Sequence, residues 1–119
     1  MIKLLSKPWL IAGCLLLAPA LQASNVSFLK YATITDFNDA DIQQMLDESN
    51  VVLTNKKPGE VHAWKNKDSE NGGEITIIKQ YQEQGSPCKR LKFRNHSKHQ
   101  SGVSYFNFCF IEKSWKVVN

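Results

Sequence analysis

Cysteine is scarce in this sequence, which contains three, at positions 14, 88 and 109, among 119 residues. No two of them have the CxxC spacing of closed zinc sites and thiol redox motifs, so both kinds of site are disfavoured. The GxSxG signature of a nucleophilic serine is also missing, and the acidic residues are scattered. Because no set of catalytic roles can be assembled, we expect a protein that is not an enzyme and needs no cofactor.

A strong excess of one charge is lacking as well. The formal net charge is +4, and removal of residues 1–23 would take away two lysines and no acids, which leaves +2. This is too small an excess to indicate a nucleic-acid partner. Internal repeats and low-complexity segments are absent, and the length suits a single domain. One disulfide would help such a small core to stay folded.

The first 23 residues have the layout of a secretory signal peptide. Two lysines precede an apolar run from Pro8 to Leu21, and the segment ends at the small residue Ala23. The run is too short for a transmembrane helix, which needs about 20 apolar residues. We therefore expect an exported protein that is periplasmic, associated with the outer membrane or secreted. After cleavage it would have no transmembrane span and would begin with an arm at residues 24–35.

A second cleavage position stays open. The stretch IAGC, which ends at Cys14, looks like a lipobox, in which Cys14 would be lipidated and become the new N-terminus. Only six residues separate Cys14 from Lys7, and the sequence stays apolar after Cys14, where a lipoprotein normally turns polar. The alternative is that Cys14 is simply an apolar member of the signal segment.

An amphipathic helix is predicted at the start of the main domain, residues 36–119. Asn38 is a suitable N-cap, and Asp39 and Asp41 fall in the first turn, where the helix dipole favours negative charge. Phe37 before the cap and Ile42 at the fourth helical position fit a hydrophobic staple. The helix continues to about Leu53 along a stripe that consists of Ile42, Met45, Leu46, Ser49 and Leu53.

Five short segments of alternating sequence follow Pro58 and Gly59, separated by short polar turns. Such segments are typical of an antiparallel meander. The predicted fold class is α+β, with one N-terminal amphipathic helix packed on a four- to five-stranded antiparallel β-meander and one disulfide. The apolar residues expected on single strand faces are Val61 and Ala63, Ile75 and Ile77, Leu91 and Phe93, and finally Phe106, Phe108 and Phe110.

The two cysteines of the main domain can be paired by register. A hairpin closed around HSKHQS has its midpoint between Lys98 and His99, and pairing outward from that midpoint places Cys88 opposite Cys109. A disulfide that closes a loop of about 20 residues stabilises a fold by on the order of 3 kcal/mol. In an exported protein we predict a structural disulfide, with a redox-active pair as the alternative.

Cations are concentrated in the same hairpin. Alternation places Arg90, Lys92 and Arg94 on one strand face, where they could bind lipopolysaccharide phosphates, anionic lipid or an acidic protein. The simpler interpretation is a solvated face that protects a sheet edge. The candidate residues for an anionic partner are Lys89, Arg90, Lys92, Arg94 and Lys98.

Three histidines, His62, His96 and His99, are the remaining candidates for special chemistry. The HSKH spacing is close enough for metal binding, but no acidic or cysteine ligand accompanies it. We therefore predict no metal site and expect the histidines to lie on the surface.

A pattern of single residues extends through the second half of the chain. It contains a glycine, a Trp-x-Asn pair, a glycine turn, a strand ending in tyrosine, two cysteines and a closing tryptophan. The residues are Gly59, Trp64, Asn66, Gly73, Tyr81, Cys88 with Lys89, Cys109, and Trp115 with Val117. With the helix that starts NDAD, residues 36–118 resemble the surface-antigen domain of the 17-kilodalton outer-membrane antigen family of Gram-negative bacteria.

The resemblance implies a cell-envelope protein with a small helix-and-sheet domain and no catalytic role. Family members often carry a lipobox and a glycine zipper before this domain, and the sequence has no glycine zipper. We thus expect an exported binding or structural module that presents a sheet surface to an envelope component or partner protein.

Two other functions stay open. One is a secreted or periplasmic inhibitor of a host or competitor enzyme, similar to lysozyme inhibitors, with Ser101–Tyr105 as the inserting loop. The other is an enzyme, which would require a pocket that holds His62 close to a carboxylate.

Overall fold

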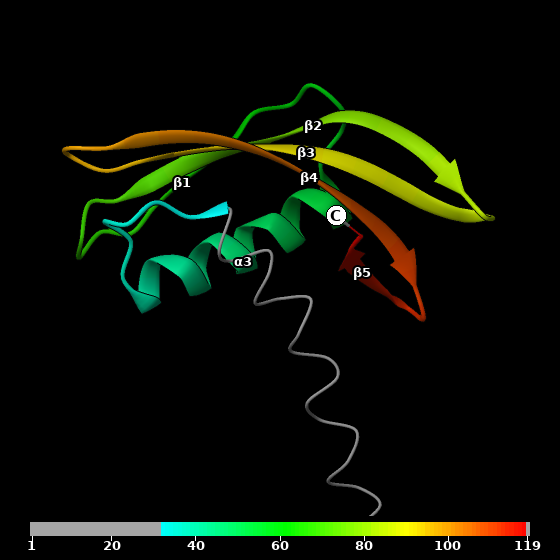
Figure 1. Cartoon of the computed structure of the whole chain (residues 1–119), viewed down its shortest axis with the longest axis horizontal. Coiled ribbons are helices and arrows are strands. Elements are labelled where there is room, and N and C mark those ends of the chain that lie inside the picture. Colours follow the sequence, from blue (N-terminus) through cyan, green and yellow to red (C-terminus); the bar gives the residue numbers. More distant parts are fainter. Residues whose placement is uncertain (1–31, 119) are drawn as a thin grey trace, which may run out of the picture.

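The computed structural model describes residues 32–118, which form one α-helix and a five-stranded antiparallel sheet (Figure 1). The strands follow one another in the sheet in chain order, so the predicted α+β meander is confirmed. The predicted signal peptide, Cys14 and residues 24–31 of the arm lie outside the described residues. The elements are α3 at Asp39–Asn55, β1 at His62–Lys65, β2 at Gly72–Glu83, β3 at Ser86–His96, β4 at Ser101–Ile111 and β5 at Ser114–Val117.

The helix starts at the predicted cap. The backbone N–H of Asp41 donates to Asn38 Oδ1 at 2.8 Å, and the backbone N–H of Asn38 donates to Asp41 Oδ2 at 2.9 Å. This reciprocal capping box stabilises the first turn. The description of this helix as N-terminal is not supported, because α3 begins at Asp39 and not at the start of the chain. The helix precedes the strands, and it ends at Asn55, slightly beyond the predicted end.

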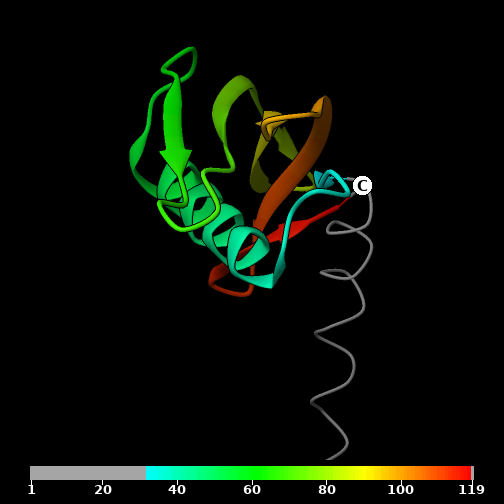
Figure 2. The ribbon, with the colours of Figure 1, turned by 90° about the vertical axis from the view of Figure 1, so that its left-hand side faces the viewer.

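One face of the sheet packs against α3 and holds the core. Figure 2 shows the strands curling around the helix. Ile75, Ile77, Leu91 and Phe93 have no exposed surface, as the alternation predicted. Met45 of the helix is equally buried against them. Full burial of a side chain of this size contributes about 1.5–3 kcal/mol, so these residues are the main source of stability.

Not all of the apolar residues expected on strand faces are buried in the core. In β1 the core residue is Trp64, which is 5% exposed, whereas Val61 is 64% exposed. Trp64 is accommodated because its cross-strand neighbour is Gly73, where a Cβ would lie 3.1 Å from Trp64 Nε1. In β4 Phe110 is 41% exposed and packs instead against Trp115, with 5.4 Å between ring centroids.

The β3–β4 hairpin has the predicted register. Cys88 lies opposite Cys109, and their Cα atoms are 4.0 Å apart across a disulfide bond. The turn is closed by the backbone N–H of Ser97, which donates to the carbonyl oxygen of Gln100 at 2.8 Å. The structural disulfide is therefore confirmed.

The described end of the predicted arm, residues 32–35, adds no strand to the sheet. Instead, residues 32–36 bind to the β3–β4 hairpin. The carbonyl oxygen of Ala32 accepts a hydrogen bond from Asn95 Nδ2, and Ser97 Oγ donates to Asp36 Oδ2 at 2.5 Å. These contacts attach the chain before α3 to the turn end of the hairpin.

Candidate functional site

The sheet face that points away from α3 gathers cations from three strands. Cross-strand pairing places Lys79 of β2 beside Arg90 of β3, because a bulge between Ile77 and Lys79 shifts the register by one residue. In β5, Lys116 lies opposite Cys109 on the same face. We call this surface the basic face, and its cations are Lys79, Arg90, Lys92, Arg94 and Lys116.

The cations of the basic face differ in how far they are neutralised. Arg94 Nε lies 3.8 Å from Glu74 Oε1, and Lys116 Nζ lies 2.9 Å from an oxygen of Glu112. No ion pair within residues 32–118 involves Lys79, Arg90 or Lys92. Glu74, Glu83 and Glu112 are fewer than the five cations, so this face keeps an excess of positive charge.

Tyrosines accompany two of these cations. The guanidinium carbon of Arg90 lies 5.3 Å from the ring centroid of Tyr105, and Lys79 Nζ lies 5.4 Å from that of Tyr81. Cation–π contacts of this kind hold the charged groups over the rings without cancelling their charge. Sequence reasoning missed Lys79 and Tyr105, which become neighbours of the basic row only through cross-strand pairing.

The basic face also exposes apolar surface. Val103, Tyr105 and Val118 are between 42% and 49% exposed. Val103 lies opposite Arg94, and Tyr105 lies opposite Lys92. Cationic and apolar side chains are therefore direct neighbours on this surface.

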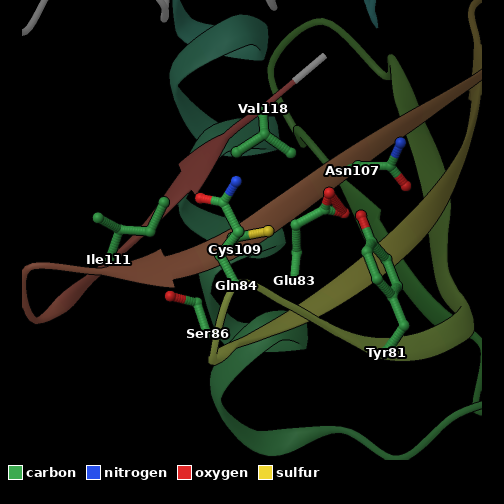
Figure 3. Close-up of a pocket in the computed structure, with 8 residues that line it drawn as sticks. All are labelled: Tyr81, Glu83, Gln84, Ser86, Asn107, Cys109, Ile111 and Val118. Carbon is green, nitrogen blue, oxygen red and sulfur yellow. The ribbon is translucent and has the colours of Figure 1, made fainter.

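A hollow of roughly 490 Å³ lies at the disulfide end of the basic face (Figure 3). Tyr81, Glu83 and Asn107 form one part of its wall, and Ile111 and Val118 form another. A second hollow of roughly 250 Å³, lined in part by Val61, Lys92 and Arg94, lies farther along the same face. Lys92 and Arg94 thus line the second hollow, whereas the first lies beyond the cations, beside the disulfide.

Lys89 does not join this surface, although the sequence grouped it with Arg90. Its side chain points to the helix side of the sheet, where Nζ donates to the carbonyl oxygen of Leu53 at 2.7 Å and lies 5.0 Å from the ring centroid of Trp115. Burial lowers the pKa of Lys89. Lys89 thus caps the C-terminal end of α3.

Lys98 is separate as well. It lies in the exposed β3–β4 turn and lines another hollow together with His96 and Asp68. Of the five residues predicted for an anionic partner, the structure therefore brings together Arg90, Lys92 and Arg94.

The histidines are dispersed. His62 Nε2 lies 2.6 Å from Glu48 Oε1, a contact that connects β1 with α3. His96 lies 3.5 Å from Glu74, and His99 is in the exposed turn. Within residues 32–118, no three residues among histidine, cysteine, aspartate and glutamate are grouped so that they could hold a metal ion.

A buried carboxylate that sequence reasoning treated only as a first-turn acid organises the loop before β2. Asp41 is fully buried and accepts hydrogen bonds from Asn66, Ser69 and Asn71 at 2.6–2.8 Å, besides that from Asn38. Burial raises its pKa, but the hydrogen bonds from Ser69, Asn38, Asn71 and Asn66 together hold it below the ordinary value. Asn66 of the antigen-like pattern is thus a structural residue.

Comparisons of the chain with family models, curated proteins and solved structures found no match. The resemblance to the surface-antigen domain accordingly depends only on the residues quoted for it. In the part of the chain that the structure describes, no helix is long and apolar enough to cross a membrane.

Proposed function

We propose that this chain is an exported, non-catalytic envelope protein whose basic face binds the phosphate-bearing headgroups of anionic lipids. The observation that carries the proposal is the excess of positive charge on that face. Lys79, Arg90 and Lys92 lie on paired strands and form no ion pair within residues 32–118.

The side chains of the basic face fit a surface that binds lipid phosphates better than a face that contacts only water. Guanidinium groups bind phosphate oxygens through two parallel hydrogen bonds. Tyrosine side chains have an apolar ring and a polar hydroxyl, which suits the boundary between headgroups and acyl chains. Exposed Tyr105, Val103 and Val118 provide apolar surface beside the charges, as a peripheral membrane surface requires.

The proposed location in the periplasm or at the outer membrane has three supports. Residues 1–23 have the pattern of a signal peptide. Cys88 and Cys109 form a disulfide, which favours an oxidising compartment. The pattern around Trp64, Asn66 and Trp115 resembles an envelope domain.

The inhibitor alternative loses one of the features that suggested it, the inserting loop. Ser101–Tyr105, expected as an inserting loop, forms the first half of β4 and is paired with β3. His62 contacts Glu48 but lines none of the hollows described above. We therefore retain the binding function and propose no catalysis.

The test is cosedimentation of the purified protein with lipid vesicles. We expect binding to vesicles that contain phosphatidylglycerol or lipopolysaccharide and none to phosphatidylcholine vesicles. The triple variant Arg90→Gln, Lys92→Gln, Arg94→Gln removes three charges from the basic face. Each cation at an anionic surface contributes about 1 kcal/mol, so we expect binding to weaken by roughly a hundredfold or more.

The matched control is Lys56→Gln, Lys57→Gln, Lys67→Gln, which removes the same charge outside the sheet. It should bind almost as tightly as the wild type. An equal loss in the control, or no binding of the wild type to either anionic vesicle, would refute the proposal. Comparison of the two anionic vesicles shows which lipid supplies the phosphate.

A further inference from the structure

In the part of the chain that the structure describes, the outer edge of β2 is open over half its length. β1 pairs only with the segment from Gly72 to Ile75, and the loop before β1 reaches Ile77, whose carbonyl oxygen accepts from the Gly59 N–H at 2.9 Å. Beyond that point, within residues 32–118, β2 has a strand neighbour on one side only, β3, and extends past the sheet's short first strand (Figure 1). We call Ile78–Glu83 the open edge; all of it is exposed except half-buried Tyr81.

The backbone groups on the open edge can be assigned from the disulfide. Cys88 and Cys109 have Cα atoms 4.0 Å apart, which is typical of the close, non-hydrogen-bonded pairs of an antiparallel ladder. The backbone groups of Cys88 therefore point toward β2, where its neighbour is Tyr81. By alternation, Gln80 and Gln82 direct their N–H and C=O groups away from β3, toward the open edge.

We infer that the open edge pairs with the open edge of a second copy of this chain, antiparallel and with a two-fold axis at Tyr81. In this register Gln80 lies opposite the second copy's Gln82, so the outward backbone groups meet and exchange hydrogen bonds. The inference follows from the strand geometry and does not rest on lipid binding.

Charge complementarity selects this register. Lys79 lies opposite the second copy's Glu83, and the symmetry repeats the pair on the other side of the axis. Opposite charges directly across two strands stabilise their pairing, whereas like charges destabilise it. A shift by two residues would remove both charge pairs, and a shift by one would bring outward-directed groups opposite inward-directed ones.

The interface is small and should give a weak dimer. The paired segment is short because the loop around Gly59 occupies the edge at Ile77, and interfaces of limited area give transient complexes. Residues directly opposite in an antiparallel pair share one face of the sheet. The dimer would therefore align the two basic faces on the same side of a continuous sheet.

The experiment is sedimentation of the full chain, as the producing cell processes it, over about a hundredfold range of concentration. We expect a reversible monomer–dimer equilibrium. Lys79→Glu alone and Glu83→Lys alone each create like charges at both pairs, and each should weaken dimerisation about tenfold or more. The double variant restores opposite charges and should dimerise like the wild type.

Mixing the two single variants gives the sharpest result. In the mixed dimer both charge pairs are again opposite, so it should form where neither single variant dimerises alone. Lys67→Glu, in the exposed β1–β2 loop, is the control with the same charge change and should dimerise normally. A wild type that stays monomeric, or single variants that dimerise unchanged, would overturn the inference. Circular dichroism confirms that each variant is folded.

Discussion

Removal of the buried carboxylate of Asp41 should strongly destabilise the fold. Asp41 is fully buried and accepts hydrogen bonds from the side chains of Asn66, Ser69 and Asn71 and from the backbone of Asn38. Asp41→Ala leaves these four donors without their acceptor and releases the loop that precedes β2.

The magnitude follows from the number of donors. A hydrogen bond to a charged group contributes about 1.5–3 kcal/mol, but the four bonds share one acceptor and are not additive. Loss of one partner from a buried charged network costs about 3–5 kcal/mol. We expect Asp41→Ala to lower the free energy of unfolding by about that amount, a large share of the ~5–15 kcal/mol of a typical domain.

The assay is urea unfolding followed by tryptophan fluorescence. Asp39→Ala is the matched control, because Asp39 is exposed in the same first turn and should cost only about 0.3–1 kcal/mol. If Asp41→Ala does not fold, Ser69→Ala removes a single donor and should cost about 1.5–3 kcal/mol. Losses below about 1 kcal/mol in both variants would refute the reasoning.

The same carboxylate predicts an acid-dependent stability. Its pKa in the fold lies below the ordinary value of 3.8. Its contribution is therefore complete above the unfolded pKa and is lost as the pH falls through the folded pKa. The wild type should lose stability over this acidic range, and a folded variant without the carboxylate should lose less.

Three further predictions concern other parts of the fold. Lys89→Met should lower the unfolding free energy by about 1–2 kcal/mol, because the bond to Leu53 is lost, and leave vesicle binding unchanged. The double variant Cys88→Ala, Cys109→Ala should lose about 3 kcal/mol in urea unfolding. Lys113→Gly should gain about 1 kcal/mol in thermal unfolding, because Lys113 has φ 68° in the β4–β5 turn.

Local signals explain which features could be predicted from the sequence. The Asn38 cap and the apolar stripe lie within one segment, and the hairpin register follows from a symmetric turn with Cys88 and Cys109 at matching distances. Burial of Trp64 could not be predicted in this way, because it depends on Gly73 in the neighbouring strand. Alternation alone therefore did not identify Trp64 as the core residue of β1.

The sequence predicted the row of cations within β3, but not the residues of neighbouring strands that complete the basic face. Alternation within β3 places Arg90 beside Lys92 and Arg94, whereas Lys79 and Tyr105 come from other strands. The separate role of Lys89 depends on where α3 ends relative to the sheet, a distance that no local pattern contains. The hydrogen bonds of Asp41 could not be predicted from a local pattern either, because the side chains that donate to it lie 25–30 residues away in the sequence.

The bulge in β2 changes which residues of the strand face the helix and which face away from it. If the register before the bulge continued without a shift, Ile78 would lie opposite Arg90, and Lys79, Tyr81 and Glu83 would turn to the helix side. Ile78, now 46% exposed, is the residue left over by this shift. Deletion of Ile78 alone should therefore remove the bulge and preserve both faces of the distal half, because Lys79 would still lie opposite Arg90.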